Sequence, residues 1–186
     1  MALPRSANRV RIIGGAWRSR VIRFAGARAV RPTPDRVRET LFNWLGQDLT
    51  GAACLDLYAG SGALGFEAAS RGARRVVMVE RDAQVFRALE RSRDALGAAQ
   101  VELVRADALE FLRGDSGRYD VVFLDPPFGS APWPNLLATL PGRLNSGALV
   151  YCESAAPFEI SAGWGVHRTG RAGQVCFRLL ERTEHE

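Results

Sequence analysis

Five short apolar segments, separated by stretches with helical spacing, restrict the possible folds of this chain more than any other feature of its sequence. The apolar segments cover residues 53–58, 76–80, 101–104, 119–125 and 148–153, and the spacing between them predicts helices over 64–71, 83–96, 108–113 and 136–144. Strands that are apolar along their whole length are typical of a parallel sheet with helices on both faces. The sequence therefore predicts an α/β fold from residue 51 onward.

The two ends of the chain depart from this alternation. Residues 164–168 and 174–181 flank a glycine-containing turn, which predicts an antiparallel hairpin that completes the sheet. At the start, residues 11–15 and 19–24 predict two short strands around a glycine turn, followed by a helix over 36–45 whose start Thr33 or Asp35 could cap. The expected organisation is a basic N-terminal extension over 1–50, made of a hairpin and a helix, and a single compact unit over 51–186.

Positive charge is concentrated at the N-terminus. Residues 1–38 hold ten arginines and one acid, a net charge of +9, whereas the remaining residues carry a net charge of −4. A basic arm on an acidic body indicates a polyanionic partner, most commonly nucleic acid, although a solvated surface would look similar. The arginines expected to contact RNA are Arg9, Arg11, Arg18, Arg20, Arg36 and Arg38.

Several classes of protein are disfavoured by composition. No apolar stretch is long enough to span a bilayer. The three cysteines are far apart among apolar neighbours, and the two histidines have no ligand spacing, so neither a disulfide framework nor a metal site is expected. An arginine-rich start can also be an organellar transit peptide, but a removed leader would not need the predicted strands. A cytoplasmic protein is expected.

A glycine-rich loop joins the first strand of the sheet to the helix that follows it. Gly60, Gly62 and Gly65 satisfy the pattern G-x-G-x-x-G, in which glycines let the backbone turn sharply and approach a ligand at a helix N-terminus. This signal is weak alone, because many such matches are structural turns.

Acidic residues follow four successive strands, at Asp56, Glu80, Asp107 and Asp125. Glu80 is placed to hold the hydroxyls of a ribose, and Asp107 either to face an adenine amino group or to cap a helix. Asp56 stands in an apolar strand, where a carboxylate is unfavourable without a partner such as a cationic ligand. Because ligands bind beyond the carboxyl ends of such strands, the four acids converge on one crevice and favour S-adenosylmethionine over NAD.

The fourth strand ends abruptly in Asp125-Pro126-Pro127-Phe128. Prolines cannot donate to a sheet ladder, so the strand must stop there. The carboxylate of Asp125 and the carbonyl of Pro126 would accept hydrogen bonds from the exocyclic amine of a base, and Phe128 would stack on its ring, an interaction worth roughly 1–3 kcal/mol. The alternative is a strand-ending proline pair with a core phenylalanine.

Taken together, these stretches resemble the RsmD family, the 16S rRNA (guanine(966)-N(2))-methyltransferases. The glycine loop and the Asp-Pro-Pro-Phe turn are similar to the cofactor and catalytic motifs of amino-methyltransferases in general. The more specific similarity lies in residues 11–20, 31–45 and 172–175. Ser19 and Pro34 depart from the family pattern, in which Gly and Thr or Ser are common at these positions.

The resemblance implies a class I, Rossmann-like, seven-stranded sheet, S-adenosylmethionine as methyl donor, and a guanine N2 in 16S rRNA of the small ribosomal subunit as acceptor. It implies a catalytic turn of Asp125, Pro126 and Phe128, in a monomer that needs no metal and no membrane. The implied cofactor-binding residues are Asp56, Tyr58, Gly60, Gly62, Glu80, Arg81, Asp107, Ala108 and Asp125.

Three other functions stay open from the residues alone. A DNA or RNA adenine-N6 methyltransferase would use the same turn, although the chain lacks an obvious domain for recognising a DNA target. An NAD-dependent oxidoreductase would explain the glycines and Glu80 but would give Asp125 and Phe128 no role. A non-catalytic RNA-binding protein that retains the fold would not need the four acids.

Overall fold

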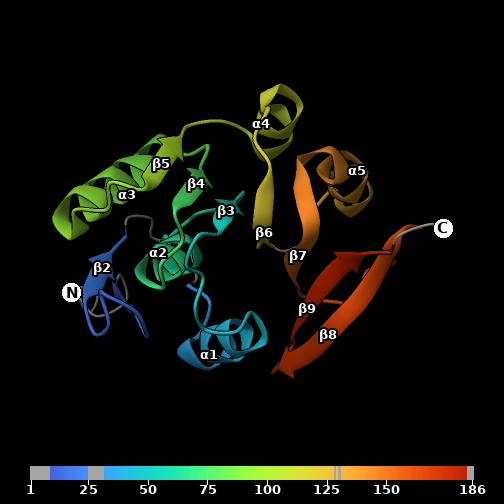
Figure 1. The fold of residues 1–186 in the computed structure, drawn as a ribbon, viewed down its shortest axis with the longest axis horizontal. Coiled ribbons are helices and arrows are strands. Elements are labelled where there is room, and N and C mark those ends of the chain that lie inside the picture. The colour runs from blue at the N-terminus through green and yellow to red at the C-terminus, as the bar shows by residue number, and fades with distance from the viewer. Residues whose placement is uncertain (1–8, 25–31, 128, 130, 184–186) are drawn as a thin grey trace, which may run out of the picture.

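A seven-stranded sheet forms the centre of the protein (Figure 1), in the strand order β5-β4-β3-β6-β7-β9-β8. The computed structural model describes residues 9–24, 32–127, 129 and 131–183. Strands β3 to β7 run parallel to one another, whereas β9 pairs antiparallel with both β7 and β8, so the predicted fold class is confirmed. The strands are β3 (Ala53–Asp56), β4 (Arg75–Val79), β5 (Val101–Val104), β6 (Tyr119–Leu124), β7 (Leu144–Ser154), β8 (Trp164–Ala172) and β9 (Val175–Arg182).

Helices cover both faces of the sheet (Figure 1), as the continuously apolar strands require. One face packs against α1, α2 and α3, and the opposite face against α4 and α5. Side chains of β3 alternate between the two layers, with Cys54 in the first and Leu55 in the second. The helices are α1 (Asp35–Trp44), α2 (Ala63–Ser70), α3 (Ala83–Leu96), α4 (Ala108–Gly114) and α5 (Trp133–Thr139).

The three cysteines are buried and free, which confirms their interpretation as core residues. Burial raises the pKa of the Cys54 thiol to about 12, so this sulfur is held in its protonated, unreactive form. Among the described residues, no helix combines the length and the apolar character that crossing a bilayer would require.

Helix α5 differs from the prediction of a single helix over 136–144. It begins earlier, at Trp133, and ends at Thr139, where a 3₁₀ turn over Leu140–Arg143 replaces it. Pro141 explains the change, because a proline has no N–H and cannot donate the i→i−4 hydrogen bond that would continue the α-helix. The fifth parallel strand then begins at Leu144, four residues before the predicted start at Ala148.

The N-terminal hairpin is present, but its first strand lies earlier than predicted. Strands β1 (Arg9–Arg11) and β2 (Val21–Arg23) pair antiparallel, and the turn between them includes most of the segment predicted as a strand over 11–15. Ser19 adopts a φ of 69°, in the left-handed region that favours glycine. The glycine that is common at this position in the resembled family therefore has a conformational reason.

The buried carboxylate of Glu67, on α2, fixes this hairpin to the sheet unit. Its oxygens accept hydrogen bonds from the backbone N–H groups of Ile13 at 2.9 Å and Gly14 at 2.8 Å. They also accept from Arg71 at 2.9 Å and Arg38 at 3.3 Å, so two guanidinium groups neutralise one buried acid. The hairpin and α1 share a single apolar core with α2 and α3.

Candidate functional site

The order of the strands reverses between β3 and β6, which is where the ligand crevice of an open α/β sheet is expected. The chain runs outward from β3 to β4 and β5, and then returns to the other side of β3 to form β6. Ligands of open α/β sheets bind beyond the carboxyl ends of the strands at such a reversal. Asp56 is the last residue of β3 and pairs in register with Phe123, two residues before Asp125. The two acids therefore end neighbouring strands at this crevice.

Asp56 is 1% exposed, and only one of its two carboxylate oxygens has a hydrogen-bond partner among the described residues. Its Oδ2 accepts a hydrogen bond from the backbone N–H of Gly65 at 3.1 Å, but its Oδ1 has no partner among the described residues. Burial, with a smaller contribution from the negative charge of Glu80, raises the pKa of this carboxyl to about 7, although hydrogen bonding to the backbone opposes the rise. A buried acceptor without a donor is unfavourable, and a ligand that brings a cationic or N–H group would satisfy it.

The glycine loop after β3 needs its glycines for two structural reasons. Gly62 has a φ of +82°, and a Cβ there would lie 2.5 Å from the ring of Phe66. At Gly65 the backbone has ordinary angles, but a Cβ would lie 2.8 Å from the side chain of Met78 on β4. The loop therefore packs closely on both α2 and β4, which positions its backbone at the crevice.

Glu80 stands directly after β4 and holds the glycine loop. Its Oε2 accepts a hydrogen bond from the backbone N–H of Gly60 at 3.1 Å, and its Oε1 accepts from that of Asp82 at 2.9 Å. Asp82 in turn caps α3, where its side chain accepts from the backbone N–H groups of Gln84 and Val85. The carboxylate of Glu80 is partly exposed, so both oxygens keep lone pairs that can accept from ligand hydroxyls.

Asp107 caps α4, which confirms one of its two predicted roles. Its Oδ1 accepts from the backbone N–H groups of Leu109 at 2.9 Å and of the following residue at 3.2 Å. Burial and, to a smaller extent, the charge of Asp107 raise the pKa of Tyr58 to about 12, against the opposing charge of Arg81. Asp107 and Arg81 therefore both lie within electrostatic range of Tyr58, and Asp107 is followed by the buried Ala108.

Asp125 belongs to a hydrogen-bonded cluster that brings together three separate parts of the chain. The hydroxyl of Thr33 lies 3.3 Å from Oδ2 of Asp125 and 3.4 Å from Oε2 of Glu153, the penultimate residue of β7. The hydroxyl of Tyr151 donates to the same Glu153 oxygen at 2.9 Å. Burial raises the pKa of Asp125 well above its ordinary value, and the charges of Glu153 and Asp56 raise it further.

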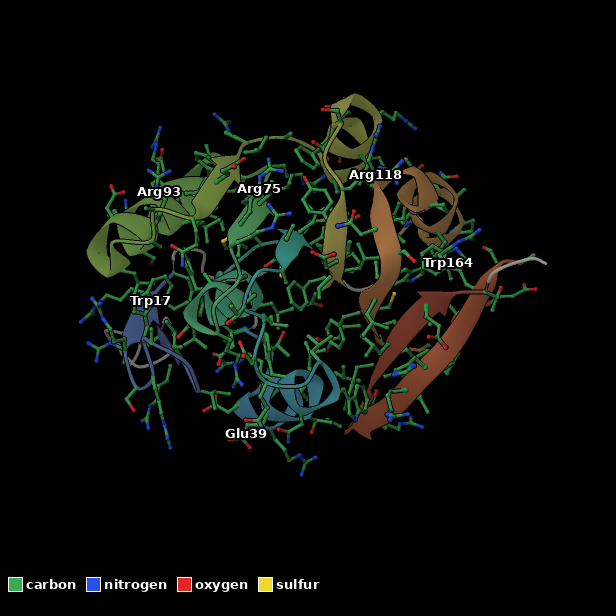
Figure 2. All side chains as sticks on the ribbon, viewed as in Figure 1. Trp17, Glu39, Arg75, Arg93, Arg118 and Trp164 are labelled. Atoms are coloured by element: carbon green, nitrogen blue, oxygen red, sulfur yellow. The ribbon has the colours of Figure 1, made fainter. Side chains whose placement is uncertain are left out.

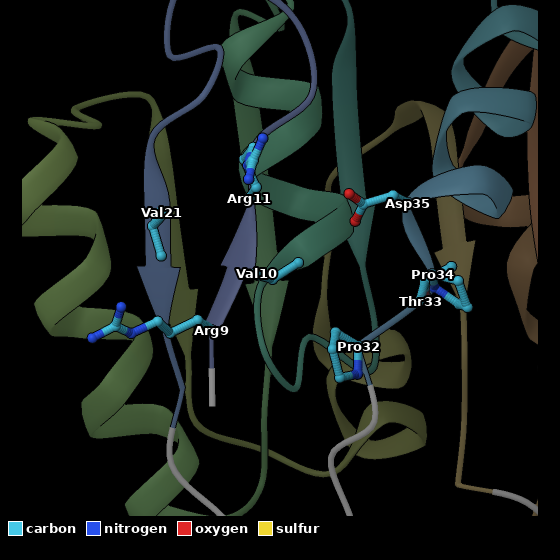
Figure 3. A pocket seen from close by; sticks show the side chains of 8 residues that line it. All are labelled: Arg9, Val10, Arg11, Val21, Pro32, Thr33, Pro34 and Asp35. Atoms are coloured by element: carbon cyan, nitrogen blue, oxygen red, sulfur yellow. The ribbon is translucent and has the colours of Figure 1, made fainter. Parts of the chain in front are cut away.

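The role predicted for Thr33 as a helix cap is wrong. The residue at the start of α1 is Pro34, and no side chain caps this end of the helix. Thr33 lies in the segment that leads into α1 (Figure 3), and its buried hydroxyl faces the carboxylates instead. Asp35 is the first residue of α1 and forms an ion pair with Arg38.

Sequence reasoning missed the participation of Glu153, Tyr151 and Thr33. One signal in the sequence could have identified Glu153. It ends the fifth predicted strand, just as the other four acids end or follow the preceding strands. Of the turn that follows Asp125, Pro126 is buried and Pro127 exposed, and Phe128 lies outside the described residues. Within the described part of the chain, no group of three or more His, Cys, Asp or Glu side chains is arranged to hold a metal ion.

The arginine arm is mostly exposed. The side chains of Arg9, Arg11, Arg18, Arg20 and Arg36 are accessible, and nitrogen-bearing side chains extend outward around the hairpin near Trp17 (Figure 2). Between the hairpin and the segment before α1 lies a pocket of about 400 Å³ (Figure 3), with two of these arginines in its lining.

Arg38 is an exception, and its predicted contact with RNA is wrong. It is 0% exposed, and its guanidinium donates to the backbone carbonyls of Thr33 and Arg11 and to the carboxylates of Asp35 and Glu67. These contacts occupy the group inside the protein, so it joins the segment before α1 to the hairpin and to α2.

Comparison with known proteins places the chain in a family. Residues 10–181 match the family described as Conserved hypothetical protein 95. The Ribosomal RNA small subunit methyltransferase D of Escherichia coli (strain K12) is 40% identical over 181 residues, covering 95% of this chain and 91% of that protein. The protein of the same name from Haemophilus influenzae is 37% identical over 186 residues, covering 96% of each chain.

The fold agrees with this relationship. The solved structure of the yhhF protein of Escherichia coli matches with a TM-score of 0.85 and 40% identity, covering 95% of this chain and 99% of that one. The match extends over the N-terminal hairpin, the glycine loop and the strand-ending acids, since the family model spans them all. The chain therefore belongs to the RsmD family of methyltransferases, as the resemblance of its motifs predicts.

Proposed function

We propose that this protein transfers a methyl group from S-adenosylmethionine to the exocyclic N2 of a guanine in 16S rRNA, at position 966 by resemblance. One observation carries the proposal: two strand-ending acids, Asp56 and Asp125, meet at the crevice between β3 and β6, and one oxygen of Asp56 is buried without a donor. The relatives named Ribosomal RNA small subunit methyltransferase D support the same substrate class.

The residues of the crevice fit the cofactor. Asp56 and the backbone of Gly60 and Gly62 would hold its methionine end, where the unsatisfied Oδ1 suits a cationic group. Glu80 would hold the ribose, and Asp107, beside Tyr58, Arg81 and Ala108, would face the adenine. When bound, S-adenosylmethionine supplies an activated methyl group attached to a positively charged sulfur.

The Asp125–Phe128 turn would position the acceptor. The amine of guanine is a poor nucleophile, because its lone pair is delocalised into the ring. Asp125 and the carbonyl of Pro126 would accept its N–H groups and so orient the lone pair toward the methyl group, while Phe128 would stack on the base. Exclusion of water and correct orientation are the main contributions that a protein makes to such a displacement.

The arm would supply affinity for RNA. We propose that residues 1–50 act as an RNA-binding extension of the methyltransferase unit over 51–186, with Arg9, Arg11, Arg18, Arg20 and Arg36 on phosphates. A monomer that acts in the cytoplasm, on the small ribosomal subunit, is the corresponding expectation. Because the amine would be inaccessible inside a helix, the target base would be either unpaired or extruded.

The direct test is transfer of labelled methyl from S-adenosylmethionine to small ribosomal subunits that lack the modification, followed by nucleoside analysis. Labelled N2-methylguanosine in the 16S digest is the expected result. Labelled N6-methyladenosine would refute the guanine acceptor and support the adenine alternative. Absence of both label and cofactor binding would refute the methyltransferase function. It would favour the NAD-dependent oxidoreductase or the non-catalytic RNA-binding alternative.

The Asp125→Ala variant tests the site itself. It is expected to lose methyl transfer while retaining most of its cofactor affinity, measured by calorimetry, because Asp125 would act on the acceptor. Asp94→Ala, an exposed aspartate on α3, is the matched control and should retain activity. Full turnover by Asp125→Ala would refute the assignment of this turn.

A further inference from the structure

Glu153 is a buried acid for which the proposed reaction, as written above, has no role. It lies near the carboxyl end of β7, next to β6 in the sheet, and is 5% exposed. Its Oε2 lies within reach of two hydroxyl donors, Tyr151 at 2.9 Å and Thr33 at 3.4 Å. Keeping a glutamate at such a buried position is unfavourable unless its charge has a function or a partner.

The hydroxyl of Thr33 connects Glu153 to the catalytic turn. It lies almost equally far from the two acids, 3.3 Å from Asp125 and 3.4 Å from Glu153, and it has one proton to donate. Thr33 itself is held in place by Arg38, whose Nε donates to the Thr33 carbonyl at 3.1 Å. The bridge is therefore built by a residue of the arm whose backbone is anchored through a buried guanidinium.

The charged groups that surround the carboxylates of Asp125 and Glu153 do not neutralise them. Asp56 adds a third negative charge from β3. The guanidinium of Arg178, on β9, donates to the carbonyl of Phe158 at 3.0 Å, and that of Arg38 faces Glu67 and Asp35. Among the described residues, neither Asp125 nor Glu153 forms an ion pair.

Two like charges at this proximity cannot both ionise easily. Burial raises the pKa of both acids, but that of Asp125 further. Glu153 accepts from the Tyr151 hydroxyl and competes with Asp125 for the single Thr33 proton, so hydrogen bonding favours the ionised form of Glu153 over that of Asp125. The ionised Glu153 then makes Asp125 a stronger base, in agreement with the direction in which the Asp125 pKa is displaced. A base of raised pKa is what a proton transfer near neutral pH needs.

We propose that Glu153 is a positioning residue whose carboxylate, held by the hydroxyls of Tyr151 and Thr33, makes Asp125 the base that takes the proton released from guanine N2. This inference rests on the proposed function. As the new N–C bond forms and the methyl–sulfur bond breaks, the nitrogen becomes positively charged and must lose one of its two protons. Asp125 takes that proton on a carboxylate oxygen, and it passes to solvent after the product leaves.

The test compares two isosteric variants, Glu153→Gln and Thr33→Val, with the exposed Glu159→Gln as control. Loss of the Glu153 charge should weaken Asp125 as a base, so the acid limb of the kcat profile moves to lower pH by about one pH unit, and the plateau falls roughly tenfold. Loss of the Thr33 hydroxyl removes a bond that lowers the Asp125 pKa, so the same limb should move to higher pH. The control should change neither.

A second readout does not depend on activity. Carbon-13 NMR of the labelled Asp125 carboxyl, in protein without cofactor or RNA, should show its titration midpoint falling in Glu153→Gln and rising in Thr33→Val. Unchanged midpoints in both variants, or shifts in the same direction, would overturn the inference even if methyl transfer by the wild type is established. A wild type that transfers no methyl group would instead refute the proposed function.

Discussion

Replacement of Asp56 by Asn should stabilise the cofactor-free protein at alkaline pH while weakening cofactor binding. The pKa of Asp56 is about 7 in the folded protein, against an ordinary value of 3.8. Because the folded-state pKa is the higher one, stability that is present below the ordinary pKa is lost as the pH rises through about 7. At 1.36 kcal/mol per pH unit, the loss between pH 5 and pH 8 is about 2.5 kcal/mol.

Asparagine does not ionise, so the variant should lack this loss. Its buried amide introduces a penalty of about 1–3 kcal/mol, but that penalty is the same at every pH. The measurement is the free energy of unfolding in urea at pH 5 and pH 8. The free energy of unfolding of the variant, relative to that of the wild type, should rise by about 2.5 kcal/mol between pH 5 and pH 8.

The exposed Asp94→Asn variant is the control, because it removes the same charge without changing a buried group. A wild type and an Asp56→Asn variant whose stabilities change in parallel with pH would refute the reasoning. Calorimetry should show the opposite effect on function, with S-adenosylmethionine bound roughly tenfold or more weakly by the variant, since the negative charge that would pair with a cationic group is lost.

Three further predictions concern the N-terminal hairpin, its attachment to α2 and the glycine loop. Ser19→Gly should stabilise the protein by up to about 1 kcal/mol, because it relieves the left-handed φ; a lowered urea midpoint would contradict this. Glu67→Gln should destabilise it by about 3 kcal/mol in the same assay, because Arg38 and Arg71 lose their shared buried partner. Gly62→Ala should lower the melting temperature and abolish cofactor binding in calorimetry, because its φ of +82° disfavours any side chain; unchanged binding would contradict the role of this loop.

Much of the sheet could be predicted from local pattern. Continuous apolar segments and glycine turns predicted the parallel strands and the closing hairpin, because a strand that is buried on both faces is apolar along its whole length. Boundaries were less certain where a proline intervened, as at Pro141, or where a turn included residues of strand-like composition, as after Arg11. The acids after the strands were also predictable, since strand ends of one parallel sheet meet at one edge.

Local amino-acid patterns were sufficient to predict the parallel sheet with its closing hairpin, the glycine loop and the acids Asp56 and Asp125 at strand ends. The order of the strands, the burial of Arg38 and the hydroxyl of Thr33 between Asp125 and Glu153 became evident only from the folded chain. Those acids lie 92 and 120 residues from Thr33 along the chain, so no periodicity could connect them. Contacts of this kind depend on how the arm packs against the sheet, which is fixed by a buried carboxylate and the two guanidinium groups that neutralise it.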